Sequence, residues 1–95
     1  MRETAVEKRL KTKVERMGGQ AWKWVSPGAR GVPDRIIFLP GGRTVFIELK
    51  APGKKPDPIQ EYRIRQLRDL GQRVEVLDSL EAVDRFIEEV KQCQY

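Results

Sequence analysis

Two apolar segments joined by Pro40-Gly41-Gly42 constrain the fold of this chain more than any other feature. Residues 34–39 and 43–49 are rich in β-branched and aromatic residues, which favour strands. The short glycine-containing connection predicts an antiparallel β-hairpin. Because most positions of the hairpin are apolar on both faces, we expect it to be buried within a sheet.

The length of the turn decides which side chains of this hairpin share a face. A two-residue turn would place Asp34 and Glu48 on opposite faces. A three-residue turn pairs Leu39 with Arg43 and places Asp34 directly opposite Glu48, on the same face. We predict the three-residue turn because it gathers Asp34, Glu48 and Lys50 at the open end of the hairpin.

These three side chains form a chemically coherent group. Two adjacent carboxylates repel each other unless a cation lies between them, and Mg²⁺ is held in proteins by one or two carboxylates. Lys50 would then stabilise charge on a scissile phosphate. Taken singly, an Asp at a strand start favours a turn, and Glu-x-Lys favours a solvated face. The apolar neighbours favour the functional interpretation, because buried charges are costly unless they are paired or metal-bound.

The remaining segments predict three helices and two further strands. Apolar residues at helical spacing, together with capping and glycine stop signals, predict the helices, and short runs of strand formers predict the strands. The order is αβββαβα, in one domain over residues 1–95 with a mixed central sheet flanked by helices. The predicted helices are 4–18, the segment from Asp57-Pro58 to Gly71, and the segment that follows Asp78-Ser79; the strands are 20–25 and 73–77.

Composition excludes several classes of protein. The chain has no histidine, so the usual serine or cysteine triads and His-metal nucleases are excluded. Its single cysteine, Cys93, allows no internal disulfide. Lys and Arg number 19 against 14 Asp and Glu, and the net charge of +5 suits a polyanionic partner. No apolar stretch predicts a signal peptide or a membrane span, so we expect a cytoplasmic protein.

Longer motifs around the hairpin resemble a known family. Val32-Pro33-Asp34 followed by Glu48-Leu49-Lys50 resembles the PD-(D/E)XK nuclease signature. The segments 30–35 and 46–51, together with Gln60, resemble the VRR-NUC family, and the resemblance runs from about residue 3 to about residue 87. It implies an α/β fold with a restriction-endonuclease-like core and cleavage of DNA phosphodiester bonds with Mg²⁺ or Mn²⁺.

The resemblance also implies roles for individual residues. Asp34 and Glu48 would be metal ligands, with the Leu49 backbone carbonyl as a third, and Lys50 would be the catalytic lysine. Two further residues would complete the site: Glu7, which would support the metal through water, and Gln60, which would lie beside the lysine.

Glu7 and Gln60 each have a structural alternative. Glu7 follows Thr4 by three residues, and Gln60 follows Asp57 by three, and both spacings fit a capping box at the start of a helix. Glu3, one turn earlier, competes with Glu7 for the acidic role on the first helix.

Basic residues flank the predicted site and are candidates for contacts with DNA phosphates. They are Arg30, Arg35, Lys54, Lys55 and Arg63. We interpret Trp22 and Trp24 as core or dimer-interface residues rather than as platforms for base stacking.

Small members of the family resemble junction-resolving enzymes, which implies a homodimer acting on Holliday junctions or related branched DNA in repair or replication, in a bacterial or phage-infected cell. A second possibility is a non-catalytic DNA-binding module on the same fold. A third is a small basic adaptor whose acidic cluster only forms ion pairs. Salt-sensitive DNA binding would separate the third from the other two.

Overall fold

The computed structural model describes residues 3–92, so Cys93 lies outside the described part. The elements follow the predicted order αβββαβα, with boundaries close to the predicted ones. They are α1 (Glu3–Arg16), β1 (Gln20–Lys23), β2 (Arg35–Leu39), β3 (Arg43–Leu49), α2 (Pro58–Asp69), β4 (Val74–Leu77) and α3 (Leu80–Gln92).

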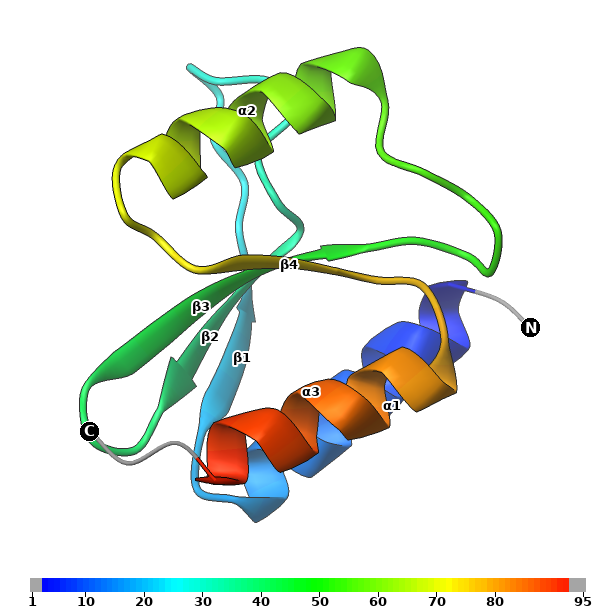
Figure 1. Cartoon of the computed structure of the whole chain (residues 1–95), viewed down its shortest axis with the longest axis vertical. Helices are drawn as coiled ribbons and strands as arrows, with labels where there is room; N and C mark the ends of the chain where they lie inside the picture. Colours follow the sequence, from blue (N-terminus) through cyan, green and yellow to red (C-terminus); the bar gives the residue numbers. More distant parts are fainter. Residues whose placement is uncertain (1–2, 93–95) are drawn as a thin grey trace.

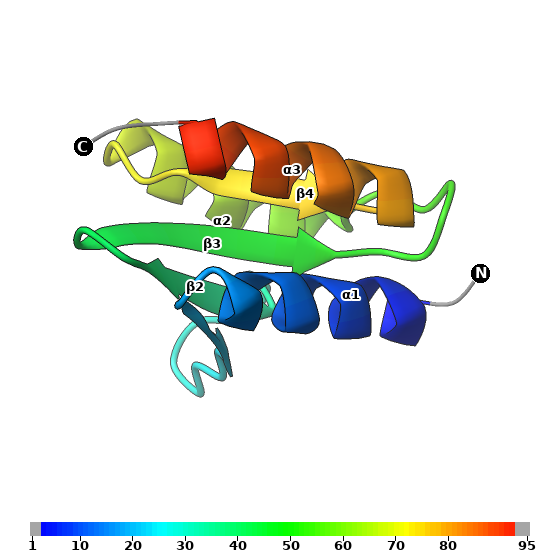
Figure 2. The same cartoon turned by 90° about the horizontal axis from the view of Figure 1, so that it is seen from below.

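The strands form one mixed sheet in the order β1-β2-β3-β4. The first three strands are antiparallel, and β4 pairs in parallel with β3 after the α2 crossover. Helices α1 and α3 cover one face of the sheet, and α2 lies over the other face (Figures 1 and 2). The predicted fold class, a mixed sheet flanked by helices, is therefore confirmed.

The hydrophobic core lies between the sheet and the α1–α3 pair. Alternate residues of the hairpin point into it, as expected for strands whose side chains alternate between faces. The helices contribute residues at spacings of three and four, which line one face of each helix. The buried core residues of these elements are Val6, Leu10, Val14, Ile37, Leu39, Val45, Ile47, Leu49, Val83, Phe86, Ile87 and Val90.

The hairpin has the predicted three-residue turn. Leu39 pairs with Arg43, and the same register continues to the pair Arg35 and Ile47. Gly41 and Gly42 have φ angles of 83° and 77°, which glycine adopts without the penalty of a side chain. Turn length and glycine placement therefore determine which residues share a face.

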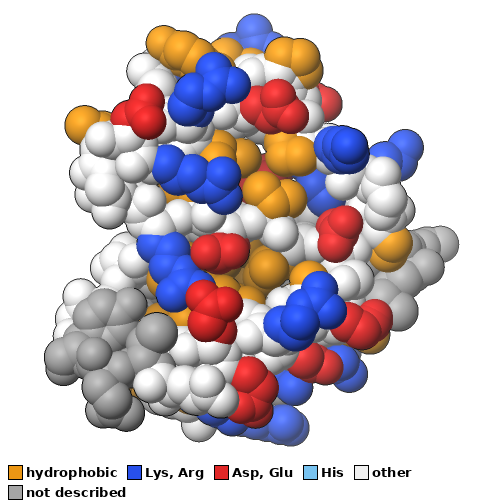
Figure 3. Space-filling model, in the orientation of Figure 1, with side chains coloured by type: hydrophobic (Ala, Val, Ile, Leu, Met, Phe, Trp, Pro, Cys, Tyr) orange, Lys and Arg blue, Asp and Glu red, His pale blue; other side chains and the backbone are white. Residues whose placement is uncertain are grey.

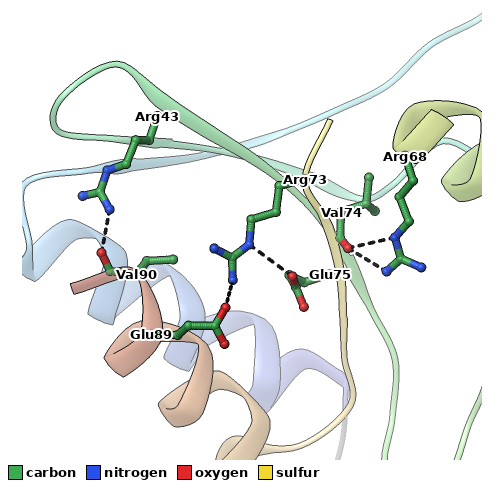
Figure 4. Close-up of polar contacts among 7 residues, drawn as sticks. All are labelled: Arg43, Arg68, Arg73, Val74, Glu75, Glu89 and Val90. Carbon is green, nitrogen blue, oxygen red and sulfur yellow. Dashed lines mark hydrogen bonds and ion pairs between the residues drawn. The ribbon is translucent and has the colours of Figure 1, made fainter. Parts of the chain in front are cut away.

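Two arginines connect α3 to the sheet by polar contacts, at the end of the sheet that is remote from Asp34. The Arg43 guanidinium donates to the Val90 carbonyl at 2.6 Å, near the C-terminal end of α3. Arg73 forms ion pairs with Glu75 on β4 and Glu89 on α3 (Figure 4). These basic residues are engaged in holding the fold together.

Two sequence expectations are corrected by the fold. Helix α1 already includes Glu3, so Thr4 lies inside it and does not form the predicted capping box with Glu7. Trp22 is 58% exposed, so it is not a core residue. The reason is that α2 leaves this part of the sheet face uncovered. Among residues 3–92, no helix has the length and apolar character that a membrane span requires.

Candidate active site

The open end of the hairpin brings Asp34, Glu48 and Lys50 together. The Asp34 Oδ2 atom accepts a hydrogen bond from the Leu49 backbone N–H at 2.9 Å. On the other side, the Asp34 carbonyl accepts from the Trp24 N–H at 2.9 Å, which continues the pairing of β1 with β2. Asp34 is therefore held from both neighbouring strands, and its carboxylate lies against β3.

Glu48 is the one fully buried acidic residue in the described part of the chain. Its Oε2 atom lies 3.3 Å from Lys50 Nζ, whose side chain is 17% exposed. Neither carboxylate oxygen of Glu48 accepts a hydrogen bond from any residue within 3–92. Burial raises the pKa of Glu48 to about 7, the Asp34 charge adds to the rise, and Lys50 opposes it.

This arrangement offers oxygen donors of the kind that a hard divalent cation prefers. Buried carboxylate oxygens without partners are costly, and a bound cation would satisfy them. In an extended strand the N–H and C=O of one residue point to the same side, so the Leu49 carbonyl also faces Asp34. Within residues 3–92, no group of three Asp, Glu or Cys side chains is close enough to hold a metal ion. A cation here would therefore rely on two carboxylates, as Mg²⁺ does in many enzymes.

Glu7 is not brought to these carboxylates. Its Oε1 atom pairs with Arg35 Nη2 at 3.1 Å, so its charge is already compensated by an arginine. The carboxylate of α1 whose charge raises the pKa of Glu48 is instead Glu3, one turn earlier and exposed to solvent. Of the two α1 candidates, Glu3 is thus the one that acts electrostatically on the predicted site.

Gln60 takes the structural role that its spacing from Asp57 predicts. Its Oε1 atom accepts a hydrogen bond from the Asp57 backbone N–H at 2.8 Å, at the first turn of α2. No hydrogen bond joins Gln60 to Lys50 within residues 3–92. The capping role of Gln60 is therefore present, and a role beside Lys50 remains a proposal.

Arg35 does not belong with the basic residues that face solvent, which corrects the sequence prediction. It is 8% exposed, pairs with Glu7, and donates to the Ala21 carbonyl at 3.3 Å. Because Arg35 follows Asp34 directly, its side chain points to the opposite face of the sheet, toward α1. Arg35 therefore joins α1 to the sheet and is not available to DNA.

The other predicted basic residues lie at the surface. Arg30, Lys54 and Lys55 are exposed in the loops before β2 and before α2. Arg63 on α2 donates through Nε to the Arg30 carbonyl at 2.7 Å, and this bond ties the two segments together.

Other arginines on α2 border a groove against β4, visible in Figure 3 as apolar surface between charged side chains. Arg65 and Arg68 lie beside Ile64 and Val76 in this groove. Arg68 donates through Nη2 to the Val74 carbonyl at 2.7 Å, so it also fixes α2 to the sheet (Figure 4).

Gly31 fixes the 26–33 loop against α2. Its φ of +82° favours glycine, and a Cβ atom here would lie 2.9 Å from the Ile59 backbone. Only glycine permits this approach. The loop therefore enters β2 at a defined position, which places Asp34 at the open end of the hairpin.

Sequence reasoning did not place Trp24 beside the site. Trp24 lies opposite Asp34 in the register of β1 and β2, and its ring contacts Phe46 with centroids 5.3 Å apart. The alternation of Trp22 and Trp24 indicated a shared face. What it could not indicate is that this face is the one carrying Asp34 and Glu48.

Comparisons with known proteins show the family to which the chain belongs. The VRR-NUC domain family model matches residues 1–81, which include Asp34, Glu48 and Lys50. A protein of Acyrthosiphon pisum secondary endosymbiont phage 1, named "Putative nuclease p44", is 52% identical over 79 residues, covering 83% of this chain and 85% of that protein. A solved structure described as a VRR_NUC domain has a TM-score of 0.87 at 37% identity, covering 90% of this chain and 94% of that one. The chain therefore belongs to the VRR-NUC domain family of nucleases.

Proposed function

We propose that this protein is a metal-dependent, structure-selective DNA endonuclease. The observation that carries the proposal is the buried Glu48 carboxylate, which has Lys50 as an ion-pair partner but accepts no hydrogen bond from residues 3–92, beside the oriented Asp34 carboxylate. Two adjacent carboxylates repel each other, and Lys50 offsets only one of the two charges, so a bound cation would stabilise the pair. Mg²⁺ or Mn²⁺ fits the oxygen donors present here.

Different residues of the chain would bind the metal and stabilise charge during phosphodiester hydrolysis. Asp34 and Glu48 would hold the cation, with the Leu49 carbonyl as a further oxygen ligand. A divalent cation supplies Lewis-acid activation of water and neutralises phosphate charge. Lys50, 3.3 Å from Glu48 and only partly exposed, presents its ammonium group to the negative charge that develops on the phosphate.

The surface charge suits DNA. The net charge is +5, and Arg30, Lys54 and Lys55 lie exposed in loops on either side of the catalytic residues. Such residues contact phosphates without reading bases. We therefore propose recognition of DNA structure rather than of sequence.

We further propose that the substrate is branched DNA, such as a four-way junction, and that the enzyme acts as a homodimer in the cytoplasm of a bacterial or phage-infected cell. One chain supplies one pair of carboxylates, whereas resolving a junction requires two opposed cuts. The exposed aromatic face around Trp22, 58% exposed and stacked edge-on against Phe38 at 5.0 Å, offers apolar surface for association.

Cleavage assays with defined DNA structures test this proposal. Labelled four-way junction, flap, duplex and single-stranded DNA are incubated with Mg²⁺, Mn²⁺ or EDTA. We expect cutting that requires the metal, favours branched DNA, and is lost in Asp34→Ala and Lys50→Ala. Lys11→Ala is the matched lysine control, because Lys11 is exposed and pairs with Glu15 on the outside of α1.

Each result of this assay has a defined meaning. Paired symmetric cuts across the junction, with a dimeric mass by light scattering, support the homodimer. Tight, salt-sensitive binding without cutting would instead favour the non-catalytic DNA-binding module. Cutting that survives in Lys50→Ala would remove the proposed role of that lysine.

A further inference from the structure

A small cavity lies between α2 and the 26–33 loop, next to the catalytic residues. Its volume is about 220 Å³, and it has little polar surface. Pockets for drug-sized ligands measure roughly 300–1,000 Å³, so this cavity is of a size for a single ring system. It is lined by Trp24, Ala29, Val32 and Leu67, with Arg63 and Gln66 as its polar members.

The wall of the cavity is continuous with the active site. Trp24 lies opposite Asp34 across the β1–β2 pair, so the two side chains share one face of the sheet. The Trp24 ring is tilted by 44° against Phe46, which pairs with Ile36 on the same face. An aromatic surface is therefore held directly across the β1–β2 pair from Asp34, one of the proposed metal ligands.

The polar members of the cavity are positioned by hydrogen bonds. Arg63 donates to the Arg30 carbonyl at 2.7 Å and, through Nη1, to Gln66 Oε1 at 2.9 Å. Gln66 Nε2 in turn contacts the Tyr62 hydroxyl at 3.2 Å. The guanidinium and amide groups are thus held in place at the edge of an otherwise apolar space.

We infer that this cavity receives one unstacked nucleobase of the DNA, from a nucleotide next to the phosphodiester that is cut. The inference rests on the proposed nuclease function and names how that site selects its substrate. Aromatic side chains stack on any base, and guanidinium and amide groups suit the hydrogen-bonding edge of a base. This differs from the core or interface role that the sequence predicts for Trp24.

Capture of an unstacked base explains selectivity for branched DNA without base reading. Flipping a base out of a duplex requires free energy to break its pairing and stacking. This free energy is smallest for a base that is already unpaired. At a junction or flap such bases lie beside the branch. In plain duplex DNA the full free energy of unpairing and unstacking a base would be needed before the phosphate could reach Asp34 and Glu48.

A binding cycle with an abasic site tests the inference without cleavage. In the Lys50→Ala background with EDTA, affinity is measured by fluorescence anisotropy for branched DNA with and without the base beside the cut. We expect loss of the base to weaken binding by roughly tenfold, the scale of one stacked base. In Lys50→Ala/Trp24→Leu the abasic and intact DNAs should bind equally. Lys50→Ala/Trp22→Leu is the matched control and should keep the difference.

Two further measurements keep the test independent of folding defects. Ala29→Phe fills the cavity from the loop, leaves the sheet intact, and should also remove the difference between the two DNAs. In a Trp22→Phe protein, Trp24 is the single tryptophan, and its fluorescence should be quenched by the intact DNA and not by the abasic DNA.

Several outcomes would overturn the inference. An equal abasic effect in all variants, or no DNA binding at all, would show that the cavity takes no base. If Trp24→Leu converts a dimer to a monomer while both DNAs bind alike, the cavity belongs to an interface between two copies of the chain. Absence of cutting by the wild-type protein would contradict the nuclease proposal alone, because the binding cycle needs no cleavage.

Discussion

The Asp34 carboxylate accepts a hydrogen bond from the Leu49 backbone N–H at 2.9 Å, across the open end of the hairpin. A side chain thus continues the pairing of β2 and β3 beyond the last residue pair of the ladder. The same carboxylate also contributes to raising the pKa of Glu48. Asp34 therefore has both a structural and a proposed catalytic role, and substitutions can separate the two.

Asp34→Asn and Asp34→Ala should differ in stability and agree in activity. Asn keeps an oxygen acceptor for the Leu49 N–H, whereas Ala leaves that donor without its partner, which costs about 1–2 kcal/mol. Urea denaturation should therefore show a loss only for Ala. Both variants should lose metal-dependent cutting, because neither carries the negative charge. A stable Asp34→Ala protein would contradict the structural part.

The stability of the metal-free protein should depend on Glu48. Its pKa in the fold is about 7, above the ordinary 4.5, so the folded state holds this proton more tightly than the unfolded chain. The resulting stabilisation is complete below about pH 4.5 and is lost as the pH rises through about 7. With EDTA present, the free energy of unfolding of the wild type should fall over this range more steeply than that of Glu48→Gln. Parallel profiles for the two proteins would show that Glu48 titrates normally.

Glu3→Gln and Glu7→Gln should affect different properties. Glu7 pairs with the buried Arg35, so its neutral variant should lose about 1–2 kcal/mol of stability. Glu3 is exposed and acts on Glu48 through its charge, so its neutral variant should change cutting and metal dependence more than stability. Thermal denaturation and cleavage rates against Mg²⁺ concentration measure the two effects. If Glu7→Gln instead shifts the metal dependence, Glu7 belongs to the metal site.

Lysines of the loop and the buried arginine should differ in their effect on DNA binding. Each of Lys54→Ala and Lys55→Ala should reduce the slope of log affinity against log salt by about 0.9, the contribution of one phosphate contact. Arg35→Ala should leave this slope unchanged and lower stability by about 2–3 kcal/mol, since it removes the partner of Glu7. A changed slope in folded Arg35→Ala would restore Arg35 to the DNA-contacting residues.

Gly31→Ala should destabilise the protein by about 2 kcal/mol or more, since alanine at positive φ is strained and its Cβ would lie 2.9 Å from the Ile59 backbone. Displacement of the 26–33 loop should also lower cutting. Gly28→Ala is the matched control, because nothing lies within 4 Å of a Cβ at that position. Equal stability of the two variants would show that the loop is free to move.

Much of the proposed catalytic site could be predicted from the sequence because it depends on short-range rules. The length of the turn and the strict alternation of strand residues place Asp34 opposite Glu48, and both rules act within one hairpin. The capping contact between Asp57 and Gln60 is likewise local, because the partners are three positions apart in the chain. Physical rules at this range leave few alternatives.

Other features depend on which helix and sheet surfaces pack together, and only the tertiary structure shows this. Arg35, predicted to contact DNA, and Glu7, predicted to support the metal, are separated by 28 positions in the chain. They form an ion pair because α1 packs on the sheet. The exposure of Trp22 and the place of Trp24 beside the cavity follow from where α2 lies over the sheet. Sequence patterns determined the strands, their register and the two carboxylates that we propose as catalytic. Long-range packing, which local alternation does not encode, determined which charged and aromatic side chains remain available to a substrate.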